Sequence, residues 1–233
     1  MNNRIVETSI LAISFIIFGL IVRSSLIDMN SIKRTVTVKG FSERLVKADK
    51  ATWPLSYTVS GNDLVSLYKS VEKKNTIIIK FLKDNGVKKS EISVNPPSTV
   101  DNEANIYSDD KKPLYRYDMR SSIIVTTGDV DNIRSLVLRQ TELFDSGIFI
   151  EDGYGYGVDY EFTKLNEIKP QMIEEATVDA RHAAEKFAED SKSKLGKIKY
   201  ARQGQFSIEN RDYNTPYIKM VRVVTTIDYN LKD

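Results

Sequence analysis

The chain has 233 residues, with 34 basic and 32 acidic side chains, one histidine and no cysteine. These counts exclude disulfides, cysteine-ligated zinc or iron–sulfur centres, cysteine nucleophiles and metal sites built from several histidines. A formal net charge of +2 gives no bulk attraction to nucleic acid, so we expect no nucleic-acid partner. A hydrophobic content of 41% and a charged content of 28% are typical of a globular protein.

An uncharged apolar run, residues 8–22, lies near the N-terminus between Arg4 and Arg23. As a helix it would measure about 22 Å, and extending it to Ile27 gives about 20 residues, the length of a bilayer span. A secretory signal peptide is the other interpretation, although no Ala-x-Ala cleavage site follows the run. A buried core helix is disfavoured because the run is apolar on every side. We predict a signal anchor or signal peptide in residues 1–30, with membrane attachment through residues 5–27, and a folded domain in residues 31–233.

The rest of the chain alternates between segments typical of strands, with period-2 polarity, and segments typical of helices. The expected strands are residues 34–39 (ended by Gly40), 51–61, 91–94, 114–127, 148–151, 157–162, 198–208 and 217–229. The expected helices are residues 63–85, 130–144 and 165–195, capped at Asn62 or Asp63 and at Asp129, with Gly196 ending the last helix. The long strand 114–127 is a candidate edge for pairing with another chain.

This order predicts an α+β fold with two similar strand–strand–helix–strand–strand halves, mainly antiparallel sheets and packed helices, after an N-terminal hydrophobic helix. The helix expected at 165–195 has Ala176, Ala180, Ala183 and Phe187 among its inward positions. Alanines allow another backbone to approach closely. Burial against the chain's own sheet and a helix–helix contact between subunits both account for them.

The sequence contains no recognisable catalytic, cofactor-binding or metal-binding set, so we predict none and expect no enzyme. His182 is the lone histidine and has no nucleophile signature to serve, which favours a solvated or satisfied side chain on the long helix. The run from Gly153 to Gly157 alternates glycine with tyrosine and precedes a strand, so it predicts a turn or bulge and not a phosphate loop.

The carboxylates of the long helix are plentiful but unspecific. Glu174, Glu175 and Asp179 share the helix with Arg181 and Lys186. Spacing of this kind is typical of surface ion pairs. We therefore interpret these side chains as a solvated helix face.

Two other features leave alternatives open. The sheet face or the acidic loop 101–112 could present a recognition surface to a protein partner. The clustered tyrosines could line the pocket of an envelope enzyme or small-ligand binder, although packing in the core or across strands also explains them. These tyrosines are Tyr115, Tyr117, Tyr154, Tyr156 and Tyr160.

Several separated segments are similar to the SIMPL domain family. Residues 35–44 (TVTVKGFSER), followed by residues 47–49 and 53–55, resemble the opening of the domain. Segments within residues 174–196 resemble its Ala- and Arg-rich helix, and residues 201–208 and 221–226 resemble one bacterial subgroup. The resemblance extends over roughly residues 34–229.

The resemblance implies a bacterial periplasmic or membrane-associated protein with no established catalytic residues. Members of the family include a periplasmic immunogen, an enteric protein linked to oxidative-stress defence, a relative that forms a ring-like or cylindrical oligomer, and an animal binding protein of inflammatory kinase signalling. We therefore expect a non-enzymatic, homo-oligomeric scaffold or binding protein, linked to envelope or oxidative stress, with an unidentified protein partner. We expect its domain outside the cytoplasm, anchored in the inner membrane. An envelope enzyme or small-ligand binder is the alternative.

Overall fold

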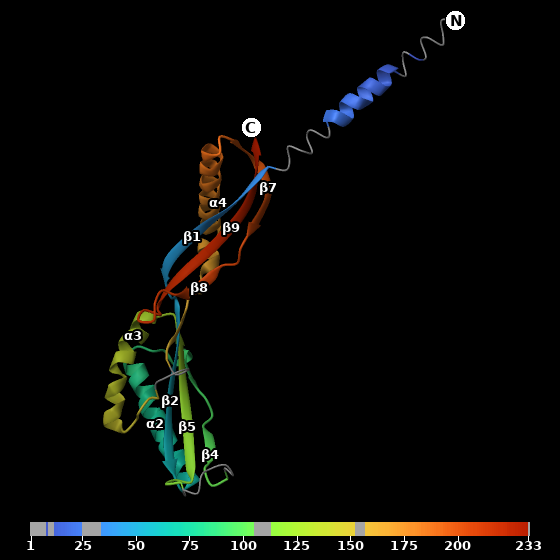
Figure 1. Cartoon of the computed structure of the whole chain (residues 1–233). Coiled ribbons are helices and arrows are strands. Elements are labelled where there is room, and N and C mark those ends of the chain that lie inside the picture. Colours follow the sequence, from blue (N-terminus) through green and yellow to red (C-terminus); the bar gives the residue numbers. More distant parts are fainter. Residues whose placement is uncertain (1–7, 9–11, 25–33, 105–112, 152–156, 233) are drawn as a thin grey trace. The chain divides into compact units, whose positions relative to one another are not determined.

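A computed structural model of the chain describes residues 8, 12–24, 34–104, 113–151 and 157–232 (Figure 1). It confirms the α+β class with antiparallel sheets. The strands are β1 (Thr35–Lys47), β2 (Lys50–Gly61), β3 (Ile92–Val94), β4 (Ser98–Asp101), β5 (Tyr117–Thr127), β6 (Asp159–Glu161), β7 (Lys194–Gln203), β8 (Ser207–Asn210) and β9 (Ile218–Lys232). The helices are α2 (Leu64–Asp84), α3 (Val130–Arg139) and α4 (Leu165–Asp190), with short 3-10 turns at Lys89–Glu91 and Gln140–Ser146.

The elements form two compact units that are interleaved along the chain. Unit 1 contains Met1–Arg44, Asn166–Ser207 and Val221–Asp233. Unit 2 contains Leu45–Leu165 and Ile208–Met220. Each unit therefore draws on segments that lie far apart in the sequence.

Unit 2 is a sheet of order β3-β5-β2-β6, with β4 also paired to β5. The central pair runs antiparallel from Ala51 opposite Thr127 to Gly61 opposite Tyr117. The helices α2 and α3 supply apolar side chains at helical spacing to one shared core, which removes those side chains from water. Strand β5 is paired with β2, β3 and β4, so the prediction that 114–127 is a free pairing edge is wrong.

The sheet of unit 1 has the order β1-β9-β7. Helix α4 buries one residue in four along its length against this unit: Met172, Ala176, Ala180, Ala184 and Ala188. Ala180 and Ala184 share a cluster with Val36, Val38, Ile227 and Tyr229, so the alanines serve the chain's own sheet. The expectation that Ala183 and Phe187 face inward is wrong, because the buried positions recur every four residues and leave both exposed.

Two glycines have other roles than those predicted. Strand β1 continues through Gly40 to Lys47, because the missing side chain at Gly40 faces the backbone of α4. Helix α4 ends at Asp190 and Gly196 lies within β7, where a Cβ atom would come within 2.7 Å of the carbonyl oxygen of Asn230. In both cases the glycine admits a close backbone approach.

Several predicted boundaries also differ. Residues 148–151 are not a strand; they join β2 through one backbone bond, from the Glu151 amide to the Ser56 carbonyl. The helix expected at 130–144 ends at Arg139 and continues as a 3-10 turn, which Gly147 closes with a positive φ of 67°. The strand expected at 198–208 is divided into β7 and β8.

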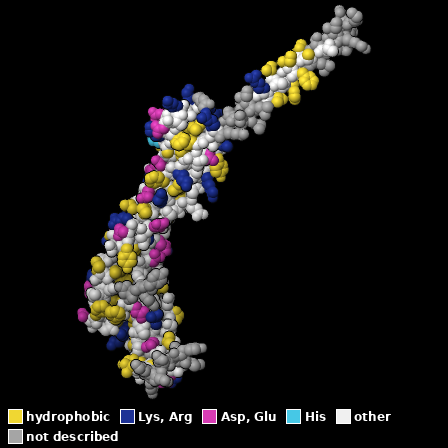
Figure 2. All heavy atoms as spheres, in the orientation of Figure 1, with side chains coloured by type: hydrophobic (Ala, Val, Ile, Leu, Met, Phe, Trp, Pro, Cys, Tyr) yellow, Lys and Arg dark blue, Asp and Glu magenta, His cyan; other side chains and the backbone are white. Residues whose placement is uncertain are grey.

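The N-terminal apolar run is described only in part. Residues 12–24 are helical, and their large apolar side chains are exposed, as Figure 2 shows; Phe15 is 75% and Phe18 64% exposed. No helix among the described residues is long and apolar enough to cross a membrane. Much of the predicted anchor, namely residues 1–7, 9–11 and 25–33, lies outside the described residues.

Candidate functional site

The segment Gly40–Arg44 of β1 is hydrogen-bonded to one face of α4. The Phe41 amide donates to Asp179 Oδ2 over 3.0 Å, and the Ser42 hydroxyl donates to Glu175 Oε2 over 2.7 Å. Arg44 forms an ion pair of 2.5 Å with Glu175 Oε1. Glu175 and Asp179 are exposed on α4, as predicted, and Glu175 is ion-paired, but both carboxylates bond to β1. Arg181 and Lys186 form their ion pairs with other carboxylates of the helix.

The absence of a side chain at Gly40 allows β1 to approach α4 closely. A Cβ atom there would lie 2.1 Å from the Ala176 carbonyl oxygen and 2.2 Å from the Ala180 amide nitrogen. With hydrogen in its place, the strand approaches the helix closely enough for the Phe41 and Ser42 contacts. The Ser42 hydroxyl, and then the Arg44 guanidinium, hold the pKa of Glu175 below its usual value, so this carboxylate is ionised at neutral pH.

The opposite face of the unit 1 sheet has no helix among the described residues. Val36 and Val38 point into the core, so by strand alternation Thr37 and Phe41 point to this other face. Thr37 Oγ1 donates to Asp228 Oδ1 of β9 over 2.7 Å, and the guanidinium of Arg222 lies 5.6 Å from the Phe41 ring centroid.

Strand β7 extends this face, because Tyr200 is the register partner of Asp228. Tyr200 is 58% exposed and Phe41 53% exposed. We call the surface formed by Thr37, Phe41, Tyr200, Arg222 and Asp228 the open sheet face. Aromatic and arginine side chains of this kind dominate the energetics of many protein interfaces.

Strand β7 is also an edge strand, since it follows β9 at the end of the sheet order. None of its residues is buried. Its charged residues are all basic: Lys194, Lys197, Lys199 and Arg202. Basic side chains on an edge oppose strand-to-strand pairing with another copy. The open sheet face is therefore a better candidate for association than the β7 edge.

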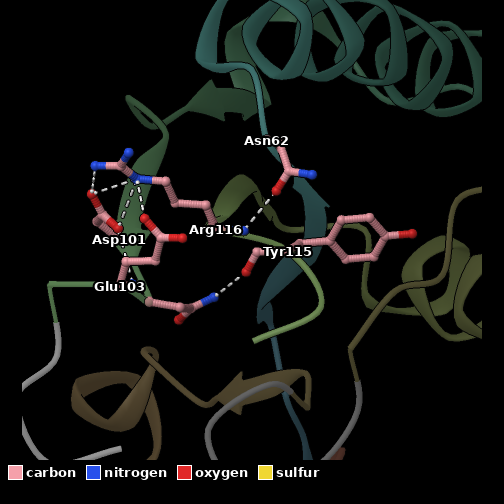
Figure 3. Close-up of polar contacts among 6 residues, drawn as sticks. Asn62, Asp101, Glu103, Tyr115 and Arg116 are labelled. Atoms are coloured by element: carbon pink, nitrogen blue, oxygen red, sulfur yellow. Dashed lines mark hydrogen bonds and ion pairs between the residues drawn. The ribbon is translucent and has the colours of Figure 1, made fainter. Parts of the chain in front are cut away.

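A second polar cluster lies in unit 2 at the ends of β4 and β5 (Figure 3). The Arg116 guanidinium contacts Asp101 Oδ2 at 3.0 Å and Glu103 Oε2 at 3.4 Å, and its amide donates to Asn62 Oδ1 over 2.9 Å. The Arg116 hydrogen bond lowers the pKa of Asp101. Asn102 donates to the Tyr115 carbonyl over 3.2 Å. Because the charges and donors are partnered within the cluster, its role is to fix the start of the loop predicted at 101–112. Residues 105–112 of this loop lie outside the described residues.

The described tyrosines of the predicted set do not lie together in one pocket. Tyr117 pairs with Gly61 at one end of β2, and Tyr160 pairs with Ala51 ten residues away, which is about 33 Å along a strand. Tyr115 is 44% exposed. Tyr154 and Tyr156, with most of the glycine run 153–157, lie outside the described residues.

The absence of catalytic, cofactor-binding and metal-binding residues stays a prediction. His182 is exposed on α4. Within residues 8, 12–24, 34–104, 113–151 and 157–232, no group of three or more His, Asp or Glu side chains is placed to hold a metal ion.

The chain matches one protein family over most of its length. The SIMPL family, described as a protein of unknown function (DUF541), matches residues 36–226. No curated protein matches the chain. The matched range begins in β1 and ends in β9, so it includes both units and the contact between Gly40–Arg44 and α4.

Proposed function

The chain belongs to the SIMPL family, and from this premise we propose that it is a non-enzymatic cell-envelope protein that assembles into oligomers and acts as a scaffold or binding protein. The observation that carries the proposal is the open sheet face. Helix α4 covers one side of a sheet whose other side exposes Phe41 and Tyr200.

The composition of this face supports association. Phe and Tyr rings bring large apolar area at a low cost in side-chain entropy, and Arg222 lies over the Phe41 ring as a further contact group. Burial of apolar surface is worth about 25 cal/mol per Å². Two half-exposed rings on each copy therefore provide a driving force for pairing that a wholly polar face lacks.

The N-terminal run supports an envelope location. Residues 12–24 form a helix with exposed apolar side chains, which water does not favour and a membrane surface or interior does. We expect the full chain to sediment with the membrane fraction and a chain beginning at Ser31 to remain in the supernatant. Equal distribution of the two chains would contradict attachment through this run.

Assembly is tested directly on the chain beginning at Ser31. Light scattering coupled to size separation should give a mass above that of one chain, with a larger share of multimers as concentration rises. A monomer at every concentration, including the highest attainable, would contradict the proposed assembly.

A further inference from the structure

A groove of about 510 Å³ lies in unit 2 between α3 and the turn that precedes β9. Asp131, Arg134 and Leu138 line it from one face of the helix, at spacings of three and four residues. Pro216 and Tyr217 line the other side.

The cationic side of this groove is held in place by aromatic packing. The Arg134 guanidinium lies 3.5 Å from the Tyr217 ring centroid. The Tyr217 ring in turn meets Tyr160 edge-on, with centroids 6.2 Å apart and planes at 72°. Tyr160 is only 8% exposed, and its burial raises the pKa of its hydroxyl. A guanidinium stacked in this way keeps its N–H edge available for a planar anion.

The opposite wall is fixed by a turn. Asp212 Oδ1 accepts hydrogen bonds from the amides of Asn214 and Thr215, over 2.9 and 2.8 Å. The Thr215 hydroxyl, then the Arg211 guanidinium and the two backbone amides, lower the pKa of Asp212 to about 2. The turn is therefore ordered before any ligand arrives, which reduces the entropy cost of binding.

The charge balance of the groove favours an anion. Asp131 is the acidic residue of the lining, and it forms an ion pair with Lys47 and a longer one of 3.4 Å with Arg134. The Lys47 hydrogen bond is the main reason that the pKa of Asp131 lies below its usual value. Lys47 and Arg134 share this one carboxylate, so the three side chains together keep a net charge of +1 beside the groove.

An apolar wall lies one helical turn from this charge. Leu138 follows Arg134 by four residues and is 81% exposed, so its side chain is accessible from solvent. Residues four apart on a helix have Cβ atoms about 5–6 Å apart. Both residues line the groove, which thus presents a cation and an apolar side chain within one lining.

We propose that this groove binds a small organic acid, with its carboxylate on the Arg134 guanidinium and an aryl body against Leu138 and Pro216. The site differs from the open sheet face in residues and in unit, so the inference stands independently of the proposed assembly. A purely structural Arg134–Tyr217 stack is the competing account, and it predicts no saturable binding.

The test is calorimetric titration of the full-length chain with 3-phenylpropionate, in which two methylene groups join the carboxylate to the aryl ring. Two analogues separate the contributions: 3-phenylpropanol lacks the charge, and acetate lacks the aryl body. The variants are Arg134→Gln and Leu138→Ala. Arg139→Gln is the matched control, because Arg139 lies on the same helix and pairs with Glu142 outside the groove lining.

We expect saturable binding of 3-phenylpropionate and at least about tenfold weaker binding of both analogues. Arg134→Gln should weaken binding about tenfold or more and Leu138→Ala several-fold, while Arg139→Gln leaves it unchanged. Absence of saturation, equal binding of the alcohol, or wild-type affinity in Arg134→Gln would each overturn the proposal. Circular dichroism of each variant confirms that the fold is retained.

Discussion

Gly40 on β1 lies against Ala176 on α4 so closely that a Cβ atom on the glycine would come within 2.1 Å of the alanine's carbonyl oxygen. Both residues fall within the segments that match the SIMPL family. The contact explains why a glycine stands in the middle of a strand and why α4 buries alanines at this position. It also aligns Phe41 and Ser42 with the carboxylates of Asp179 and Glu175.

Replacing Gly40 by alanine should destabilise unit 1 severely. The new methyl group would meet backbone atoms of Ala176 and Ala180, which cannot move without shifting the helix, so we expect a loss of about 3 kcal/mol or more. Gly157→Ala is the control, because a Cβ there has open space and the cost should stay below about 0.5 kcal/mol. Urea unfolding followed by far-UV circular dichroism measures both, and equal midpoints would contradict the close packing.

Glu175→Gln should lower stability at neutral pH and remove part of its acid dependence. The folded-state pKa of Glu175 lies below its ordinary value of 4.5, so its stabilisation is present above that pH and is lost as the pH falls through the lowered pKa. The difference in free energy of unfolding between wild type and variant should therefore shrink below pH 4.5. Glu174→Gln, at the exposed neighbouring position, is the matched control. A pH-independent difference for Glu175→Gln would contradict this role.

Tyr57→Phe should destabilise unit 2 by about 1–3 kcal/mol. The buried hydroxyl contacts the Val71 carbonyl at 3.0 Å and Asn75 Oδ1 at 2.8 Å, and Ser121 donates to the same amide oxygen. Trp53 is the only tryptophan and is buried in the same core, so its fluorescence follows this unit during unfolding. Tyr213→Phe, at a site 96% exposed, should leave the midpoint unchanged.

The Tyr57 hydroxyl should also make the stability of the protein depend on pH in the alkaline range. Burial raises the pKa of Tyr57 to about 12, so its contribution is fully present below pH 10 and is lost between pH 10 and 12, as the unfolded chain ionises first. The stability difference between wild type and Tyr57→Phe should therefore decrease over that range. A difference that is constant up to pH 12 would show that the hydroxyl titrates normally.

Local patterns predicted the elements better than their assembly. Helix α2 was expected at 63–85 and spans Leu64–Asp84, with Asp63 capping it through the Ser66 amide, because spacing and capping are properties of neighbouring residues. The pairing of β1 with β9 joins residues such as Thr37 and Asp228, 191 positions apart. No local pattern carries information about such a pair, so the interleaving of the two units was not predicted.

The candidate surfaces likewise depend on contacts between distant residues, which local sequence patterns do not predict. The local pattern at Gly40 predicts a strand end, whereas the role of this glycine depends on a helix more than 130 residues away. A tyrosine in a strand is ordinary, so the sequence alone gives Tyr200 no special role. The structure places it on an edge strand with no buried residue. Arg134 and Tyr217 meet only after α3 and the segment before β9 have packed.

The most direct measurement of the central claim is the self-association of Tyr200→Glu, compared with that of wild type and Tyr213→Glu, in chains beginning at Ser31. The new carboxylate lies beside its register partner Asp228, so desolvation and like-charge repulsion should oppose pairing through the open sheet face. Sedimentation equilibrium should show multimers for wild type and Tyr213→Glu, and at least about tenfold weaker association for Tyr200→Glu. Equal association of all three chains would contradict assembly through this face.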